Sequence, residues 1–220
     1  LNRGIFDEEK DLYLRTSADL GITRLGQLVA SSGSISQQEL QQRFADTFAQ
    51  TIKSAQDASA INPADAANWM NLGKIYEAVI PLQMREATDF AKGAYEKAGE
   101  AFPSSPEPLL ASARVELSRN DLPRAREFLK AAISLKNDFA QAHFLLAQLE
   151  AATGNMDLAI ESAETTAFLA PNDVGALFQL GLLYYQKERF ADAKVVFERA
   201  VGINSSYSNA RYFLGLIYSR

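Results

Sequence analysis

The sequence LGLLY occupies residues 180–184 and returns 34 residues later as LGLIY at residues 214–218. A related stretch, LGKIY, occupies residues 72–76. Small residues follow the same period of 34, apart from one interval of 40 that gives the first unit six extra residues. These small residues are Gly73, Ala113, Ala147, Gly181 and Gly215. A fixed period of this length indicates a fold built from stacked copies of one helical unit.

A second set of positions repeats downstream of the small residues with the same period. Each copy has an alanine followed by further members at steps of four, three and five residues. The copies are Ala91-Tyr95-Ala98-Pro103, Ala125-Leu129-Ala132-Asn137, Ala159-Ala163-Thr166-Pro171 and Ala193-Phe197-Ala200-Ser205. Because two separate sets share one period, we favour a true repeat over a generic helical bundle with accidental spacing.

The residue types suit a unit of two antiparallel helices. The small residues of the first helix let the second helix approach closely, and bulky residues at steps of three and four fill the seam. On the second helix, the matching small positions are Ala91, Ala125, Ala159 and Ala193. Pro103 and Pro171 end the second helix because proline cannot donate the next backbone hydrogen bond. The turn between the helices is marked by Asn-Asp at residues 120–121 and Gly-Asn at residues 154–155.

With this period and these positions, residues 63–220 resemble the tetratricopeptide repeat (TPR) family. The resemblance implies an all-α fold, a right-handed superhelical solenoid of antiparallel helix pairs. The predicted units lie at about residues 66–105, 106–139, 140–173 and 174–207, with a half unit at 208–220. Ser112, Glu116 and Glu150 depart from the family, which prefers Leu at the first position and Tyr at the others. We therefore expect weaker packing at these three positions.

Residues 1–62 match the repeat poorly but keep helical periodicity. Phe44, Phe48 and Ile52 mark one face of a helix predicted over residues 37–60. This division makes residues 1–62 a divergent helical segment that precedes the repeats.

The start of that helix and the segment before it carry local signals. Ser36 is predicted to cap the helix, with Glu39 three residues later as a capping box. Residues 31–34, SSGS, are expected to form a loop, and residues 12–29 suggest one or two further helices. The segment is either a docking surface or a cap for the first apolar face of the solenoid, and we favour the cap.

The composition is that of a folded, mildly acidic protein, with 47% hydrophobic residues, 22% charged residues and a formal charge of −5. Lys and Arg are interleaved with Asp and Glu, so nucleic acid is not predicted as a partner. The lack of cysteine excludes disulfides, thiolate metal sites and a cysteine nucleophile. No apolar run approaches the roughly 18 residues of a membrane-spanning helix, and no signal peptide is visible. Because the chain starts with Leu1, we interpret it as a processed chain or a piece of a longer one.

No constellation of residues points to catalysis. The single His143 lies at a position that usually packs inward, so we expect a partly buried, hydrogen-bonded side chain. No dyad stands out from ordinary surface charge among the carboxylates Glu39, Glu77, Glu86 and Asp89. Nucleotide-binding glycine motifs and a G-x-S-x-G elbow are absent. We therefore predict no enzyme, no cofactor and no metal site; the alternative is an unrecognised carboxylate site within residues 1–62.

The TPR resemblance implies a peptide or protein partner, because in that family the first helix of each unit lines a concave groove. Here the groove is polar and partly basic in the early units and aromatic in the late ones. The residues predicted to contact the partner are Asn71, Lys74, Arg114, Gln148, Phe178 and Tyr185. Some family members clamp the C-terminal carboxylate of a chaperone with Lys, Asn and Arg, but too few residues match for us to predict this. The late aromatic residues also suit packing between repeats.

A narrower resemblance rests on FQLGLLYY at residues 178–185 and NARYFLGL at residues 209–216. Both look like repeats at the C-terminus of bacterial O-antigen ligase/polymerase-like membrane proteins. The ANW sequence at residues 67–69 and the extended first unit add to the likeness. The membrane part of those proteins has no counterpart in this chain, so the resemblance implies no activity. It favours a bacterial extracytoplasmic or cell-surface setting over the cytoplasm.

The ends of the repeat array suggest a second function, self-assembly into a homo-oligomer or filament. The last helix crowds apolar residues that no following helix covers, namely Tyr212, Phe213, Leu216 and Ile217. The face marked by Phe44, Phe48 and Ile52 lies near the other end. Two different apolar faces would give a head-to-tail contact, which forms rings or open filaments. The alternative is a chain cut within a repeat, whose missing helix covers the last face.

Overall fold

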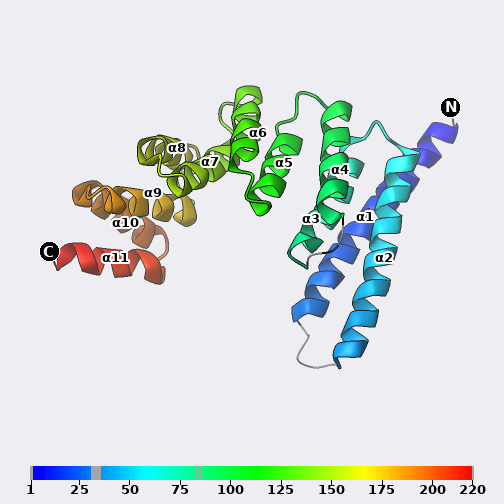
Figure 1. Ribbon diagram of the computed structural model, residues 1–220, viewed down its shortest axis with the longest axis horizontal. Helices are drawn as coiled ribbons and strands as arrows, with labels where there is room; N and C mark the ends of the chain where they lie inside the picture. Colours follow the sequence, from blue (N-terminus) through cyan, green and yellow to red (C-terminus); the bar gives the residue numbers. More distant parts are fainter. Residues whose placement is uncertain (1, 31–35, 83, 85, 220) are drawn as a thin grey trace. The chain divides into compact units, whose positions relative to one another are not determined.

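The computed structural model describes residues 2–30, 36–82, 84 and 86–219, and every regular element in those ranges is a helix (Figure 1). The chain folds as two compact units, one ending at Asn120 and the other starting at Asp121.

The first unit contains two helical hairpins and one further helix. Its helices are α1 (Asn2–Ala30), α2 (Gln37–Ile61), α3 (Ala66–Val79), the short 3-10 helix η1 (Ile80–Leu82), α4 (Ala87–Ala101) and α5 (Glu107–Ser118). α1 pairs with α2, α3 pairs with α4, and α5 packs against α4. Ile75, Val79 and Tyr95 are buried at the centre of the core that these helices share.

The second unit repeats the same hairpin. Its helices are α6 (Leu122–Leu135), α7 (Ala140–Ala152), α8 (Met156–Leu169), α9 (Val174–Gln186), α10 (Phe190–Ile203) and α11 (Ser208–Tyr218). α7 pairs with α8 and α9 with α10, while α8 packs on α9 and α10 on α11. Leu177, Leu183 and Phe197 fill the core between them. The predicted all-α fold of stacked antiparallel helix pairs is confirmed.

The small residues lie where helices approach each other, as predicted. A Cβ atom on Gly73 would lie 2.3 Å from the Tyr95 ring, and one on Gly181 would lie 2.6 Å from the Phe197 ring. Ala91 and Ala193, on the second helices, have no exposed surface. Gly215 differs, because a Cβ atom there would meet no described residue within 4 Å.

A residue with left-handed backbone conformation follows each of the helices α3, α5, α7 and α9. The backbone angle φ is positive at Glu86 (64°), Asn120 (61°), Gly154 (81°) and Glu188 (60°), each 34 residues from the next. Asn120 and Gly154 could be recognised from the sequence because their residue types favour this conformation. A glutamate in this conformation costs about 1–2 kcal/mol, so the repeat geometry overrides local preference at two of the four turns. The six extra residues of the first pair fall between α3 and Glu86, where η1 lies.

Polar partners accompany the three departures from the repeat pattern, and the weaker packing expected there stays a prediction. The Glu116 side chain has no exposed surface and lies 2.6 Å from Lys92 Nζ. Glu150 accepts hydrogen bonds from Arg126 Nε at 2.6 Å and from its Nη2 at 3.0 Å. The hydroxyl of Ser112 donates to the Pro108 carbonyl at 2.9 Å. Each glutamate that replaces a tyrosine is therefore paired with a cation from the helix before its own: Glu116 of α5 with Lys92 of α4, and Glu150 of α7 with Arg126 of α6.

The N-terminal segment forms a single hairpin, with one helix rather than two before the predicted loop. The loop expected at residues 31–34 lies outside the described residues. Ser36 caps α2 as predicted, because its Oγ accepts from the Glu39 N–H at 3.2 Å. Phe48 is buried, and Phe44 and Ile52 pack against the same core. The face expected to be open for self-assembly is therefore covered within the first unit. The domain boundary at residue 62 stays a prediction.

Candidate functional site

Two of the predicted partner contacts in the first unit lie on α3 and have different surroundings. The side chain of Lys74 is exposed. Asn71 is only 4% exposed, and its Nδ2 donates to Asp19 Oδ1 of α1 at 2.5 Å. Asn71 therefore contacts the N-terminal helix instead of an open surface.

Arg114, the third predicted contact, belongs to a polar cluster that joins α3, α4 and α5. Its Nε and Nη2 donate to the two carboxylate oxygens of Glu77 at 2.8 and 3.1 Å. The hydroxyl of Tyr95 donates to Glu77 as well. The hydrogen bond to Glu77 raises the pKa of Arg114, and burial raises the pKa of Tyr95. Because Glu77 compensates the charge of Arg114, Lys74 is the exposed cation among the three predicted contacts.

The predicted contacts in the second unit combine an exposed amide with packed aromatic rings. Gln148 on α7 is exposed, whereas Phe178 and Tyr185 on α9 are half-buried. The ring centroids of Phe178 and Tyr185 lie 5.9 and 5.0 Å from the ring centroid of Phe213 on α11. Phe178 and Tyr185 therefore pack between successive repeats and present only part of their surface to solvent.

The residues predicted for self-association divide into two groups on α11. Tyr212 is 64% exposed. Phe213 and Ile217 are half-buried against the core of the second unit, and Leu216 is also half-buried. Among these four residues, Tyr212 is therefore the one that is largely open to solvent.

A buried polar network between α1 and α3 could not be predicted from the sequence. Asn68 has no exposed surface; its Nδ2 donates to Asp11 Oδ2 at 3.0 Å and its Oδ1 accepts from Arg15 at 3.1 Å. Arg15 also donates to Asp65 at 2.5 Å. The partners are at least 50 residues apart in the chain, so no local pattern shows the pairing.

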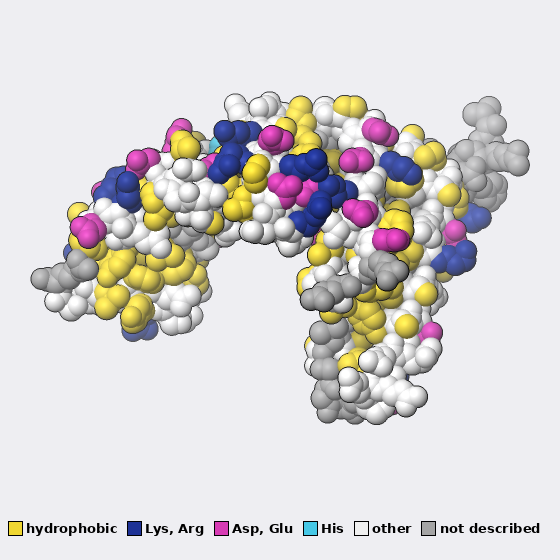
Figure 2. Space-filling view, in the orientation of Figure 1, with side chains coloured by type: hydrophobic (Ala, Val, Ile, Leu, Met, Phe, Trp, Pro, Cys, Tyr) yellow, Lys and Arg dark blue, Asp and Glu magenta, His cyan; other side chains and the backbone are white. Residues whose placement is uncertain are grey.

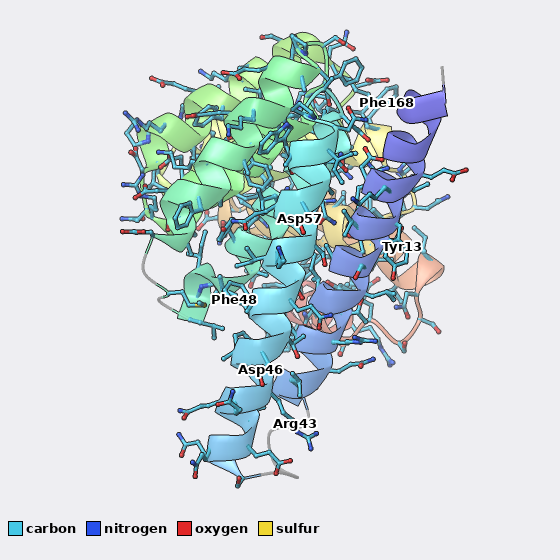
Figure 3. All side chains as sticks on the ribbon, turned by 90° about the vertical axis from the view of Figure 1, so that its right-hand side faces the viewer. Tyr13, Arg43, Asp46, Phe48, Asp57 and Phe168 are labelled. Atoms are coloured by element: carbon cyan, nitrogen blue, oxygen red, sulfur yellow. The ribbon has the colours of Figure 1, made fainter. Side chains whose placement is uncertain are left out.

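Each unit contains an open cavity. In the second unit a cavity of about 380 Å³ lies among α6, α7 and α8, with His143 on its wall. His143 is half-buried and its Nε2 donates to the Asn137 carbonyl at 2.9 Å, as expected of a structural histidine. In the first unit a cavity of about 530 Å³ lies between α1 and α2 beside Arg43 and Asp46, which Figure 3 labels. Within the described ranges, no three His, Asp or Glu side chains converge as metal ligands, and no helix suits a membrane span.

Two tetratricopeptide repeat models match the sequence, one over residues 110–174 and the other over residues 174–207. The chain contains tetratricopeptide repeats. The matched residues 110–207 comprise most of α5 and the helices from α6 to α10. No curated protein matches the sequence.

Solved TPR structures share the fold at low sequence identity. PilF of Pseudomonas aeruginosa has a TM-score of 0.70 at 13% identity, covering 96% of this chain and 86% of that chain. MamA has a TM-score of 0.61 at 21% identity, and the match covers 76% of this chain and 95% of MamA. YrrB, described as a TPR protein with an unusual peptide-binding site, has a TM-score of 0.57 at 19% identity, covering 76% and 84%. The likeness to PilF is one of fold and covers nearly the whole chain.

Proposed function

We propose that the chain is a non-enzymatic scaffold that holds a peptide or protein segment against the first helices of its repeats. The observation that carries the proposal is the TPR architecture, in which Lys74 on α3 and Gln148 on α7 are exposed at predicted contact positions. YrrB, which has the same fold, has a peptide-binding site. Repeat proteins commonly use the extended surface of stacked helices for such binding.

The polar clusters support binding rather than catalysis. Glu77 is engaged by Arg114 and Tyr95, and Glu150 by Arg126. A carboxylate held in this way is stabilised as an ion-pair partner and is poorly placed to accept a substrate proton.

Site-specific photo-crosslinking tests the surface. A photoreactive residue at Lys74, Gln148 or Tyr212 would be compared with one at Phe168 or Val195, which are 82% and 65% exposed on second helices. We expect one protein partner to be captured from the first-helix positions and not from the two controls. Equal capture from both sets, or capture only from the controls, would exclude the first helices as the binding surface.

Self-assembly remains a second candidate, because apolar side chains are exposed on helices of both units. Tyr212 and Tyr218 are 64% and 60% exposed on α11. On α1, Leu12, Tyr13 and Leu20 are 52%, 73% and 56% exposed, and Figure 3 shows Tyr13 on the side of α1 away from α2. Since the phenylalanines of α2 are covered, the α1 residues are the apolar side chains that a head-to-tail contact would use.

Light scattering over a range of protein concentrations tests this second function. Self-assembly predicts a rising mass that Tyr212→Asp and Tyr13→Asp each abolish. Both side chains are exposed, so neither change should unfold the chain. A monomer at every concentration would eliminate self-assembly.

The narrower resemblance to O-antigen ligase/polymerase-like proteins remains a proposal about setting alone. It supports a bacterial extracytoplasmic or cell-surface location. Sequencing the gene on both sides of this chain tests it, and a run of membrane helices before Leu1 is the expected result. Flanking sequence without membrane helices would remove this support.

A further inference from the structure

The first helices of the second unit form a connected surface. The Gln179 side chain of α9 donates from Nε2 to the Phe144 carbonyl of α7 at 3.3 Å. Phe178 and Tyr185 of α9 contact the Phe213 ring of α11. We call one set of side chains the first-helix face: Gln148 of α7, Phe178, Leu182 and Tyr185 of α9, and Tyr212 and Leu216 of α11.

Charge is segregated between the two kinds of helix in this unit. Among all residues of α7, α9 and α11, only Glu150 and Arg211 are Asp, Glu, Lys or Arg. The second helices are rich in charge, for example Asp157 and Glu161 on α8 and Lys194 on α10. The first helices of the first unit also differ, because they carry Lys74, Glu77 and Arg114.

The two exceptions do not put charge on the first-helix face. Glu150 is 2% exposed and paired with Arg126. Arg211 is exposed on α11, but it lies in the register that buried Leu177 occupies in the preceding repeat and is therefore not one of the positions of this face. The face is therefore made of aromatic, aliphatic and amide groups. Exposed Gln148 and Tyr212 lie on its outer helices, and half-buried Leu182 lies between them on α9. Figure 2 shows hydrophobic side chains gathered over the α9–α11 region.

This arrangement selects a partner by charge. A charged group buried against the face would lose its hydration without gaining a counter-charge, which is costly. Aromatic and aliphatic groups would gain by contact, and the glutamine amides can donate to and accept from a peptide backbone. We propose that the first-helix face of the second unit binds an apolar peptide segment without charged side chains. This inference rests on the proposed scaffold function and names the class of partner.

The test uses randomised peptides displayed on phage and selected on the full chain, followed by affinity measurements on the enriched peptides. We expect them to be rich in Leu, Ile, Phe and Tyr and to lack Asp, Glu, Lys and Arg. Raising NaCl from about 50 to about 500 mM should change their affinity by less than about twofold, because no ion pair is screened.

Matched charge insertions locate the binding. Gln148→Glu and Tyr212→Glu should each weaken binding about tenfold or more, since each places a charge in the contact. Phe168→Glu and Val195→Glu introduce the same charge on second helices and should change affinity by less than about twofold. All four side chains are exposed, and thermal melting confirms that each variant folds.

The experiment distinguishes failure of the apolar-peptide inference from failure of the proposed scaffold function. Acidic peptides that lose binding with Lys74→Glu and at high salt would overturn the inference and leave the scaffold function standing. Occupation of the face by a second copy of the chain would also overturn the inference. In that case the chain would self-associate, Tyr212→Glu would abolish the self-association, and no peptide would compete with it. If no peptide is enriched, both the inference and the proposed scaffold function fail.

Discussion

At the scale of single residues, two glycines determine how closely the helices of a pair approach. The Tyr95 and Phe197 rings occupy the space that side chains on Gly73 and Gly181 would need. Both rings are almost fully buried. Since a packed core tolerates little added volume, glycine at these positions is required by contact and not by backbone conformation.

Gly73→Ala should therefore destabilise the chain by about 1–3 kcal/mol, because the added methyl group overlaps the Tyr95 ring. Gly93→Ala is the matched control. Gly93 lies within α4 and has nothing near its Cβ position, so alanine should stabilise the helix by about 0.5–1 kcal/mol. Urea unfolding measures both values. Equal effects of the two substitutions would contradict the contact.

Glu150 should make stability depend on pH. The hydrogen bond from Arg126 holds the pKa of Glu150 below its ordinary range, against the effect of burial. A carboxyl group with a lowered folded-state pKa stabilises the fold above its unfolded pKa of about 4.3, and this stabilisation is lost as pH falls through the lower folded pKa.

Glu150→Gln should cost about 1–3 kcal/mol at neutral pH, and the difference from the parent chain should shrink as the pH falls below about 4.3. Glu161→Gln, an exposed change on the neighbouring helix α8, should stay within about 0.5 kcal/mol of the parent. Denaturant unfolding from pH 7 down to pH 3 measures both differences. A Glu150→Gln difference that does not change with pH would rule out the role of the ionised pair.

At the scale of elements, the N-terminal helix α1 contacts the repeats through polar groups as well as through the apolar core. Three polar side chains of α1 contact residues at the start and along the length of α3. Asp11 contacts Asn68, Arg15 contacts Asp65, and Asp19 contacts Asn71. Asp11 and Asn68 are almost fully buried. Buried polar groups contribute when every member is paired and become costly when one partner is removed. We therefore expect the complete network to contribute to holding α1 against α3.

Asn68→Ala should destabilise the chain by about 1–3 kcal/mol, because it removes the amide donor of buried Asp11. Hydrogen exchange should accelerate in α1 more than in α4. Lys53→Ala removes only an exposed ion pair with Asp57 and should cost less than about 0.5 kcal/mol. Unchanged exchange in α1 would show that the network does not hold this helix.

At the scale of the whole molecule, the cores are formed between neighbouring helices within each compact unit. Ile75 belongs to the core of the first unit and Phe197 to that of the second. In repeat proteins, stability is approximately a sum of local terms, so damage to one core should remain local. This differs from a small globular domain, which unfolds as one cooperative unit.

Phe197→Ala should cost about 3–5 kcal/mol, because Phe197 has no exposed surface. The loss of hydrogen-exchange protection should be concentrated in α9, α10 and α11 and should be small in α1 to α4. Ile75→Ala should give the reverse pattern in the first unit. A uniform loss of protection with either variant would mean that the two cores unfold together.

The sequence by itself determined the repeat period, the close approaches at Gly73 and Gly181, and the Ser36 cap, because each depends on short-range sterics or local hydrogen bonding. Only the tertiary structure decided which predicted contacts remain open. It buried Asn71 under α1, compensated Arg114 with Glu77, and packed Phe178 against α11. It also left Gln148 and Tyr212 exposed. These outcomes depend on the distance between helices that are far apart in the chain, and a periodic pattern carries no information about which distant side chain fills that space.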